Sequence, residues 1–504
     1  MVFPYETHER VSNPMSQKIG LSKSRITLFE QCPKRLWLSV HKPEEAEESA
    51  GTRAAFADGH RVGELACALN PEGVMISADK GLADAVEQTA SLIRGGWRKP
   101  IFEATFAHEG VLVRVDLMLP QGAGWHVAEV KNTTGVKDYH LGDLATQLWV
   151  MQGAGIEIAS AAIRHLDRTF ILTCEGEFDG LFIDTHVYDW VSAIVGERPA
   201  VAAAAGRTLL GAEPEKEIGS HCDAPFTCSF KAYCGRNLPP SPQWPADLLP
   251  DAKGKQVARQ WRELGIDDLL QIPASAMPNA KLDRIYTATT TGVPFHDRAA
   301  IRAEVDQWAF PRTFLDFETI QFAIPRWVGT RPFSQVPFQF SAHIEQAGGS
   351  IDHQEFLSLD GSDPRRSCAE ALAALPAHGA VVAWFASFER SCLLGLAELF
   401  AEFAPALLSL AERLVDPLPL VRQHYYHRDM LGSWSLKSVL PTVDPDGYSN
   451  LAEVKSGTDA QAGYMEAIDP ATSPERHAAV RDAMLEYCRR DTEAMMIVLK
   501  ALTV

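Results

Sequence analysis

The sequence lacks any apolar run that approaches the roughly 20 residues needed to span a bilayer. Its opening stretch, MVFPYETHERVSNPMSQ, also lacks the basic and then apolar layout of a secretory signal peptide. These two absences predict a cytoplasmic protein without a membrane partner. Thiols stay reduced in the cytoplasm, so grouped cysteines there bind metal more often than they form disulfides.

The sequence also lacks an excess of basic residues: 47 Lys and Arg stand against 65 Asp and Glu, a formal net charge of −18. Neutralisation of phosphates drives nucleic-acid binding, so this balance argues mildly against such a partner. A basic channel can nevertheless be a local feature of an acidic protein. A length of 504 residues with 46% hydrophobic residues predicts two to four globular domains.

The first half of the chain carries helical and strand patterns in the order expected of an α/β domain over residues 20–237. Helical spacing of apolar residues predicts helices at 22–40, 57–70, 78–94 and 138–152. Alternation with period two predicts strands at 101–108, 111–119, 125–131 and 158–166. Because turns containing glycine separate the first three strands, we expect them to form an antiparallel meander.

The composition changes after Cys234. Residues 238–254 contain five prolines, and we interpret 238–305 as a connector with a small helical element. A second α/β domain is expected over 306–504. Its predicted elements are strands at 313–319, 336–344, 353–359 and 380–385, a helix ending at 375, and helices at 388–403 and 477–499.

Three charged residues interrupt apolar strands of the first domain: Asp116 in VRVDLML, and Glu129 and Lys131 in HVAEVK. Residues i and i+2 of a strand face the same side, so Glu129 and Lys131 point into one cleft, where Asp116 can meet them. Two carboxylates can hold Mg²⁺ or Mn²⁺, and a lysine can orient the attacking water and offset charge on a phosphorane. Exposed strand residues are the alternative, but buried charges need partners or a metal.

These motifs resemble the RecB-like branch of the PD-(D/E)xK nucleases. SKSRITLFEQCPKRLWL is similar to the opening helix of that branch, with its Cys-Pro pair, and DLATQLWVMQGAG is similar to its glutamine-containing helix. The resemblance implies that Gln147 lies beside the active site. The branch usually carries a histidine on an upstream helix, and in DGHRVGELA the candidate is His60, with Glu64 as an alternative acid. A surface or structural role for His60 stays open.

Cys222, Cys228 and Cys234 come from one compact loop, and Cys32 lies far upstream. Four thiolates suit a 4Fe–4S cluster or structural zinc, although zinc sites usually show cysteine pairs at short spacing; simple buried thiols are the third possibility. One distant cysteine with three clustered ones resembles the Fe–S nucleases of the RecB-like branch, including CRISPR-associated spacer-acquisition exonucleases and AddB-type helicase-nuclease subunits. That resemblance implies a cluster that pins the two ends of the domain together.

A second group of carboxylates lies in the other domain. Asp316 and Glu318 share one face of a predicted strand in RTFLDFETI, and Tyr487 and Asp491 share one face of a helix in EYCRRDTEAM. Between them, Glu389 opens a helix in AWFASFERS. Four carboxylates brought together can hold two metal ions about 3.5–4 Å apart, and Tyr487 could position the nucleophilic water.

This half resembles the DEDD-type 3'-5' exonucleases of RNase H-like fold, which include DnaQ-like proofreading subunits and RNase D. The DFE string is similar to the first motif, and Y-x3-D to the third motif of the tyrosine-bearing subgroup. The second motif, typically N-x-x-F-D, is present with Phe385 in place of asparagine and Glu389 in place of aspartate. The first change removes a polar contact and the second lengthens a carboxylate arm. A domain kept only for binding is the alternative.

The whole chain resembles bacterial fusions of a RecB-like Fe–S nuclease with a DEDD-type exonuclease, a domain-of-unknown-function family, over residues 20–240 and 305–500. The resemblance implies a metal-dependent nuclease with Mg²⁺ or Mn²⁺ at both sites. We expect it to act on DNA ends or single strands, in repair or mobile-element defence, where a helicase or defence complex is a possible partner. A nucleic-acid-binding scaffold with one or both sites inactive, and an RNA-directed exonuclease, stay open as alternatives.

Overall fold

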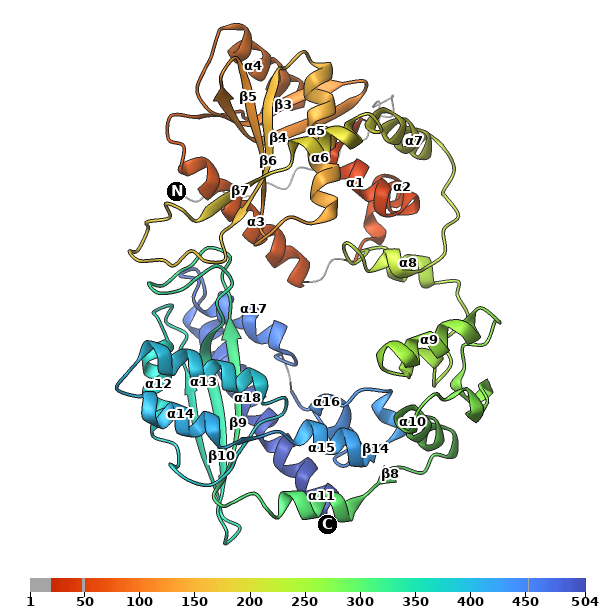
Figure 1. Ribbon diagram of the computed structural model, residues 1–504, viewed down its shortest axis with the longest axis vertical. Coiled ribbons are helices and arrows are strands. Elements are labelled where there is room, and N and C mark those ends of the chain that lie inside the picture. The colour runs from red at the N-terminus through yellow and green to blue at the C-terminus, as the bar shows by residue number, and fades with distance from the viewer. Residues whose placement is uncertain (1–19, 48–49, 452) are drawn as a thin grey trace. The chain divides into compact units, whose positions relative to one another are not determined.

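A computed structural model describes residues 20–47, 50–451 and 453–504 (Figure 1). The opening stretch that we compared with signal peptides lies outside these residues. The chain divides into two compact units, Met1–Leu238 and Pro239–Val504, and each is a mixed α/β structure built around its own sheet. Within the described residues, no helix combines the length and the apolar character that crossing a membrane requires.

The first unit is built on a seven-stranded sheet in the order β2-β3-β4-β5-β6-β7, with β1 paired to β4. Strands β3, β4 and β5 form the expected antiparallel meander, and β6 runs parallel to β5. The strand bounds are β1 (Leu21–Ser22), β2 (Val74–Met75), β3 (Ile101–His108), β4 (Val111–Gln121), β5 (Gly124–Lys131), β6 (Ile158–Leu166) and β7 (Phe182–His186).

Helix α5 returns the chain from β5 to β6 and supplies much of the first core. It spans Asp138–Gly153, and every residue from Asp143 to Met151 is buried. Its apolar residues pack with alternate residues of β4 such as Val113 and Val115, because successive strand residues face opposite sides of the sheet. The other helices are α1 (Lys23–Gln31), α2 (Pro33–His41), α3 (Ala50–Ala68), α4 (Leu82–Arg94), α6 (Tyr188–Val195), α7 (Arg198–Leu210) and α8 (Lys231–Gly235).

The prediction of a single helix over 22–40 is wrong at one point. The backbone of Cys32 is extended, with φ −163° and ψ 118°, so that α1 ends before it and α2 begins after it. Pro33 explains the break, since proline lacks an N–H and its ring disfavours a helical conformation of the residue before it. The break places the Cys32 side chain at a junction between two helices.

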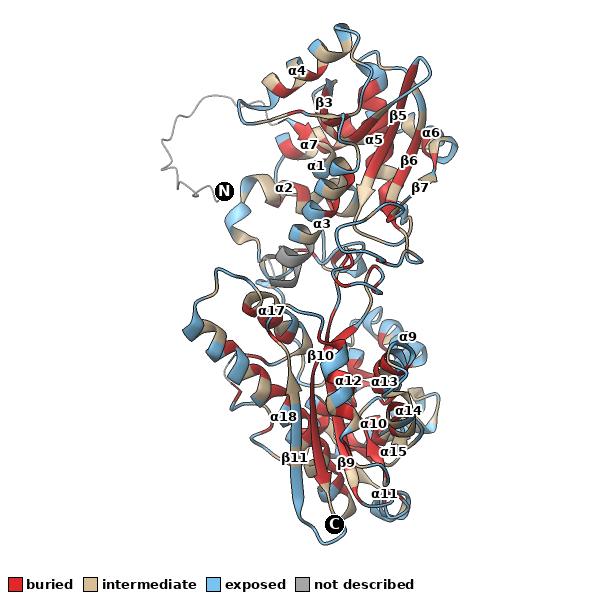
Figure 2. Cartoon of the chain, turned by 90° about the vertical axis from the view of Figure 1, so that its left-hand side faces the viewer, coloured by how far each residue is buried: buried red, intermediate tan, exposed pale blue. Residues whose placement is uncertain are grey.

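The second unit is built on a five-stranded sheet in the order β11-β10-β9-β12-β13. Strand β10 is antiparallel to both of its neighbours, whereas β9, β12 and β13 are parallel. The central strands β9 and β10 are buried and the edge strand β11 is largely exposed (Figure 2). The bounds are β9 (Arg312–Ile320), β10 (Val336–Glu345), β11 (Ile351–Leu357), β12 (Val381–Val382) and β13 (Leu414–Val415).

Helices cover both faces of this sheet. Apolar residues of α12, α13 and α14 pack on one side, with Phe340 and Ala342 of β10. On the other side Thr492 of α18 bonds to Ser341 and His343, the alternate residues of the same strand. The bounds are α12 (Arg365–Ala373), α13 (Ser387–Leu399), α14 (Ala404–Glu412), α15 (Pro417–His424), α16 (Leu436–Val439), α17 (Gly457–Ala467) and α18 (Pro474–Thr503).

The segment that we interpreted as a connector, 238–305, is part of the second unit. Its helices are α9 (Asp251–Arg262), α10 (Ala280–Thr291) and α11 (Arg298–Val305). Leu249, Leu282 and Ile285 of this segment are buried in the same core as Val498 of α18. The segment is therefore a packed subdomain. Its prolines lie in turns between short helices that each bury apolar residues.

Candidate functional site

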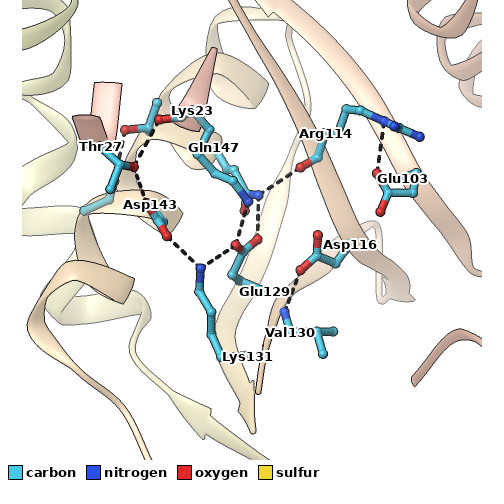
Figure 3. A network of polar contacts seen from close by, with 12 residues as sticks. Lys23, Thr27, Glu103, Arg114, Asp116, Glu129, Val130, Lys131, Asp143 and Gln147 are labelled. Carbon is cyan, nitrogen blue, oxygen red and sulfur yellow. Dashed lines mark hydrogen bonds and ion pairs between the residues drawn. The ribbon is translucent and has the colours of Figure 1, made fainter. Parts of the chain in front are cut away.

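Asp116, Glu129, Lys131 and Gln147, together called the first site below, converge from β4, β5 and α5 (Figure 3). The Lys131 Nζ lies 2.9 Å from the Glu129 Oε1, and the Gln147 Nε2 donates to the Glu129 Oε2 at 2.7 Å. Asp116 accepts a bond from the Val130 backbone N–H at 2.8 Å. Glu129 is only 2% exposed, so its charge depends on these partners.

Two members of this network were missed by the sequence reasoning. Lys23, the first residue of α1, places its Nζ 2.5 Å from the Glu129 Oε1. Asp143 of α5 accepts from the Lys131 Nζ at 2.6 Å and from the Thr27 hydroxyl at 2.7 Å. Asp143 stands four residues before the predicted Gln147 on the same helix face, and this spacing could have found it. No local pattern distinguishes Lys23 from a surface lysine.

The charged groups of the first site shift one another's pKa. Burial and the neighbouring Glu129 raise the pKa of Asp116 well above the usual range of a carboxyl. Burial would also raise the pKa of Glu129, but Lys23 and Lys131 hold it well below its usual range. Glu129 and Asp143 raise the pKa of Lys131 against the effect of burial. A divalent cation fits this donor set, because it would favour the ionised form of Asp116 that burial disfavours.

His60 and its alternative Glu64 lie on α3, and both are exposed. Within the described part of the chain no hydrogen bond or ion pair joins either of them to the first site, so the role implied for His60 stays a prediction. Glu103 of β3 was not foreseen. It faces Asp116 across the β3–β4 pairing closely enough to raise the pKa of that carboxyl, and it pairs with Arg114, whose Nε lies 3.0 Å away.

The four predicted cysteines line one cavity of the first unit, together with Arg35 and Lys34 of α2. All four thiols are free, and all are buried except the half-buried Cys234. Cys32 contributes from the junction of α1 and α2, and the other three come from the loop before α8 and from α8 itself. Among the described residues, the buried Nε–H of Arg35 has no hydrogen-bond acceptor.

Within the part of the chain that the structure describes, no three of the cysteine sulfurs lie within 4.8 Å of one another. Sulfurs around one tetrahedral zinc ion would lie about 3.8 Å apart, as follows from a Zn–S bond of about 2.3 Å. A 4Fe–4S cluster separates its ligands more widely and offers sulfide acceptors to an unpaired N–H such as that of Arg35. Four cysteine ligands suit either group.

The second site consists of Asp316, Glu318, Glu389, Tyr487 and Asp491. Asp316 and Glu318 lie on β9 and Asp491 on α18, and their carboxylate oxygens lie within 4.8 Å of one another. Glu389 of α13 is 3% exposed and close enough to Asp316 to raise the pKa of that carboxyl. The structure thus brings together the four carboxylates that the sequence placed on separate elements.

Lys437 and Tyr448 complete the second site, and sequence reasoning did not place them there. The Lys437 Nζ donates to the Tyr487 hydroxyl at 2.8 Å, and the Tyr448 hydroxyl donates to the Asp491 Oδ1 at 2.5 Å. Trp434, three residues before Lys437, is instead buried and donates to a backbone carbonyl. Among the described contacts, Lys437 therefore reaches the second site and Trp434 packs locally.

Negative charge dominates the second site. Burial, together with the neighbouring carboxylates, raises the pKa of Asp316 and Glu318 well above their usual range, and burial also raises that of Asp491. Burial raises the pKa of Glu389 to about 8, and its Oε2 is buried without a partner among the described residues. Lys437 opposes only part of this charge. Grouped oxygen ligands of this kind, with one left unpaired, fit Mg²⁺ or Mn²⁺.

The turn before α13 carries the segment that we compared with the second motif of the DEDD enzymes. Phe385 has a φ of +70° and is 59% exposed. The Asp416 carboxylate accepts from the backbone N–H groups of Phe385 at 3.1 Å and Ala386 at 3.2 Å. A positive φ is uncommon for a bulky residue and more common for asparagine, the residue usual at this point in the DEDD enzymes. Phe385 therefore occupies a backbone position that suits asparagine better.

Comparison with known families gives one match, over residues 313–435, to a model described as Domain of unknown function (DUF2779). The matched segment lies in the second unit and includes Asp316, Glu318 and Glu389. It ends before Tyr487 and Asp491, and it covers less than half of the chain. A comparison with curated proteins gives no match.

Proposed function

We propose that this protein is a metal-dependent nuclease that degrades or trims DNA, at single strands or ends, through two phosphodiesterase sites. The observation that carries the proposal is the grouping of Asp316, Glu318 and Asp491 within 4.8 Å, beside the unpaired Glu389 carboxylate. Buried carboxylates in such proximity repel one another unless protons or cations compensate them. Two-metal phosphodiesterases use this kind of ligand set.

The topology of the second unit supports a DEDD-type RNase H-like domain. Its strand order and the single antiparallel strand β10 follow the arrangement expected of that fold. The first and third motifs lie on the central strand β9 and on α18, which packs against it. Metal ions held by the carboxylates would polarise a phosphodiester, while Tyr487 could hold the attacking water.

The topology of the first unit supports a RecB-like PD-(D/E)xK domain. An antiparallel meander, a helix and a strand parallel to the last strand of the meander are the core expected of that fold. Asp116 and Glu129 would hold Mg²⁺ or Mn²⁺, Lys131 would orient water, and Gln147 fixes the Glu129 carboxylate. Asp143 in turn holds Lys131 in position.

A 4Fe–4S cluster on Cys32, Cys222, Cys228 and Cys234 is part of the proposal. Its support is the common cavity and the unpaired Nε–H of Arg35. Such a cluster would tie α1 and α2 to the end of the first unit. This link matters for the first site, because α1 also carries Lys23.

A second candidate function is a nucleic-acid-binding module in the second unit, with catalysis confined to the first. The strained Phe385 and the longer arm of Glu389 favour it, because both depart from the catalytic motif. RNA in place of DNA is a further alternative, since DEDD enzymes use both. A role in repair or mobile-element defence, alongside a helicase or defence complex, follows from the resemblance alone.

The decisive experiment incubates the purified protein with Mn²⁺ and end-labelled single- and double-stranded DNA and RNA. We expect degradation of single-stranded DNA or of DNA ends that chelation stops. The matched control is the double variant Glu129→Gln, Asp316→Asn, which keeps side-chain volumes and removes one charge from each site. Equal degradation by the variant would refute both sites, whereas binding without degradation by the wild type would favour the scaffold.

A further inference from the structure

Both carboxylate oxygens of Glu129 are already engaged in the first site (Figure 3). The Oε1 lies 2.5 Å from the Lys23 Nζ and 2.9 Å from the Lys131 Nζ, and the Oε2 accepts from the Gln147 Nε2 at 2.7 Å. An ionised carboxylate oxygen has about two lone pairs, so the Oε1 is fully engaged, and a metal ion that binds it must replace one of the two lysines.

The three donors are not equally anchored. Lys131 also pairs with Asp143 at 2.6 Å, and Gln147 also donates to the Arg114 carbonyl at 3.0 Å. The hydrogen bond and ion pair described for the Lys23 Nζ involve Glu129 alone, and the Lys23 side chain keeps 19% of its surface exposed. Lys23 can thus leave Glu129 without breaking a second bond, and it has access to water when it does.

Charge makes the departure of Lys23 favourable once a metal ion arrives. Lys23 and Lys131 now balance part of the negative charge of Asp116, Glu129 and Asp143. A divalent cation placed against Glu129 with both ammonium groups present would face two like charges within a few ångströms. Withdrawal of one ammonium group relieves this repulsion. Among the described ion pairs, Lys131 has a second carboxylate partner in Asp143 and Lys23 has none, so Lys23 is the group that withdraws.

We propose that Lys23 is a displaceable counter-ion of the first site. It neutralises Glu129 when no metal is bound, yields the Oε1 to an incoming Mg²⁺ or Mn²⁺, and then has a free ammonium group for a phosphate of the substrate. Metal binding and nucleic-acid binding would thereby support each other. The inference rests on the proposed function, because it assumes that Glu129 is a metal ligand.

The test measures Mn²⁺ binding by the full-length protein without nucleic acid, from the EPR signal of the free ion. An Asp316→Asn background weakens binding at the second site. We expect Lys23→Met and Lys23→Gln to tighten Mn²⁺ binding on the order of thirtyfold, the effect of one unit charge about 4 Å from a divalent ion in a water-like dielectric. Lys23→Arg should leave the affinity near that of the background. The exposed Lys99, which pairs with Glu72 in the same unit, supplies the control Lys99→Met.

The comparison with Glu129→Gln keeps this inference distinct from the proposed function. If Glu129→Gln fails to weaken Mn²⁺ binding, the first site is not a metal site and the proposed function fails there. If Glu129→Gln weakens binding but both neutral Lys23 variants bind Mn²⁺ no more tightly than the background, only the counter-ion role is overturned. Thermal melts confirm that each variant is folded, and two different neutral side chains guard against a local packing defect.

Discussion

At the scale of single residues, the two sites differ in how their buried carboxylates are compensated. Lys23 and Lys131 hold Glu129 ionised in the first site, whereas the second site has Lys437 against four carboxylates. At neutral pH the first site therefore offers an ionised Glu129 beside an Asp116 whose pKa is raised, while the second site would have to lose more protons before it could bind a metal ion. Metal affinity should accordingly depend on pH more steeply at the second site.

We predict that the metal-free protein loses stability as the pH rises, because Glu389 loses its proton. Burial raises the pKa of Glu389 from 4.5 to about 8, so the folded state holds a proton that the unfolded state releases between these values. The stabilising contribution is complete below pH 4.5 and is lost as the pH rises towards 8. Melting curves in EDTA from pH 5 to 9 should show wild type losing stability relative to Glu389→Gln. A constant difference would contradict the prediction.

We predict a large loss of DNA degradation for Lys131→Ala, by about a hundredfold or more, because the proposed function places the lysine between the metal ligand Glu129 and the reacting phosphate. Asp143→Asn keeps Lys131 but weakens its anchor, so its loss should be smaller, roughly tenfold. Initial rates with Mg²⁺ on labelled single-stranded DNA give both values, measured in an Asp316→Asn background. Wild-type rates for Lys131→Ala in both Mg²⁺ and Mn²⁺ would place the main site elsewhere.

At the scale of elements, strands were predicted better than the places where helices stop. Strands β3 and β6 have the bounds predicted from alternation, because apolar and polar residues alternate along a half-buried strand. The break at Cys32 was missed, although Pro33 marks it. The strand predicted at 380–385 ends at Val382, because the chain then turns through Phe385 into α13.

Regular spacing within one element predicts a shared face and could also have found Asp143, whereas Lys23 and Tyr448 reach their sites from other elements. Glu129 and Lys131 stand two apart on a strand, so their common face follows from strand geometry. Lys23 reaches Glu129 from 106 residues away, and Tyr448 reaches Asp491 from 43 residues away. Such contacts arise from tertiary packing, and no local period in the sequence encodes them.

The turn from β12 to α13 allows a prediction about backbone strain. Phe385 is 59% exposed and holds a φ of +70°, so the chain gains little burial there and bears a strained backbone. Phe385→Asn should raise the free energy of unfolding by roughly 1 kcal/mol, because asparagine tolerates this conformation better. Urea denaturation measures the change, and Leu394→Asn, an exposed position on α13, is the control that should not stabilise. Destabilisation by Phe385→Asn would show that the ring makes a needed contact.

At the scale of the whole molecule, we predict that a cluster bound by the four cysteines stabilises the fold of the first unit. Anaerobically purified protein should be brown, with iron and sulfide in amounts that match one cluster. Cys228→Ala should lose the colour and lower the melting temperature of the first unit, because ligand binding and folding are coupled. Cys174→Ala is the matched control, since Cys174 is free and exposed. Stoichiometric zinc without iron would refute the cluster.

We expect the two proposed sites to differ in catalytic rate. Glu389 can still reach a metal, since a longer arm lowers geometric precision and keeps the charge, whereas Phe385 cannot donate the hydrogen bond of an asparagine. A misplacement of about 1 Å can slow catalysis on the order of a hundredfold, so the second site should be active but slow.

In a Lys131→Ala background we expect residual exonuclease activity that Mn²⁺ stimulates and Asp316→Ala abolishes. Adding Glu389→Asp and Phe385→Asn should raise that residual rate. If the background is inactive on DNA and RNA and the added changes restore nothing, the second unit is a binding module, and the buried carboxylates around Asp316 need another explanation.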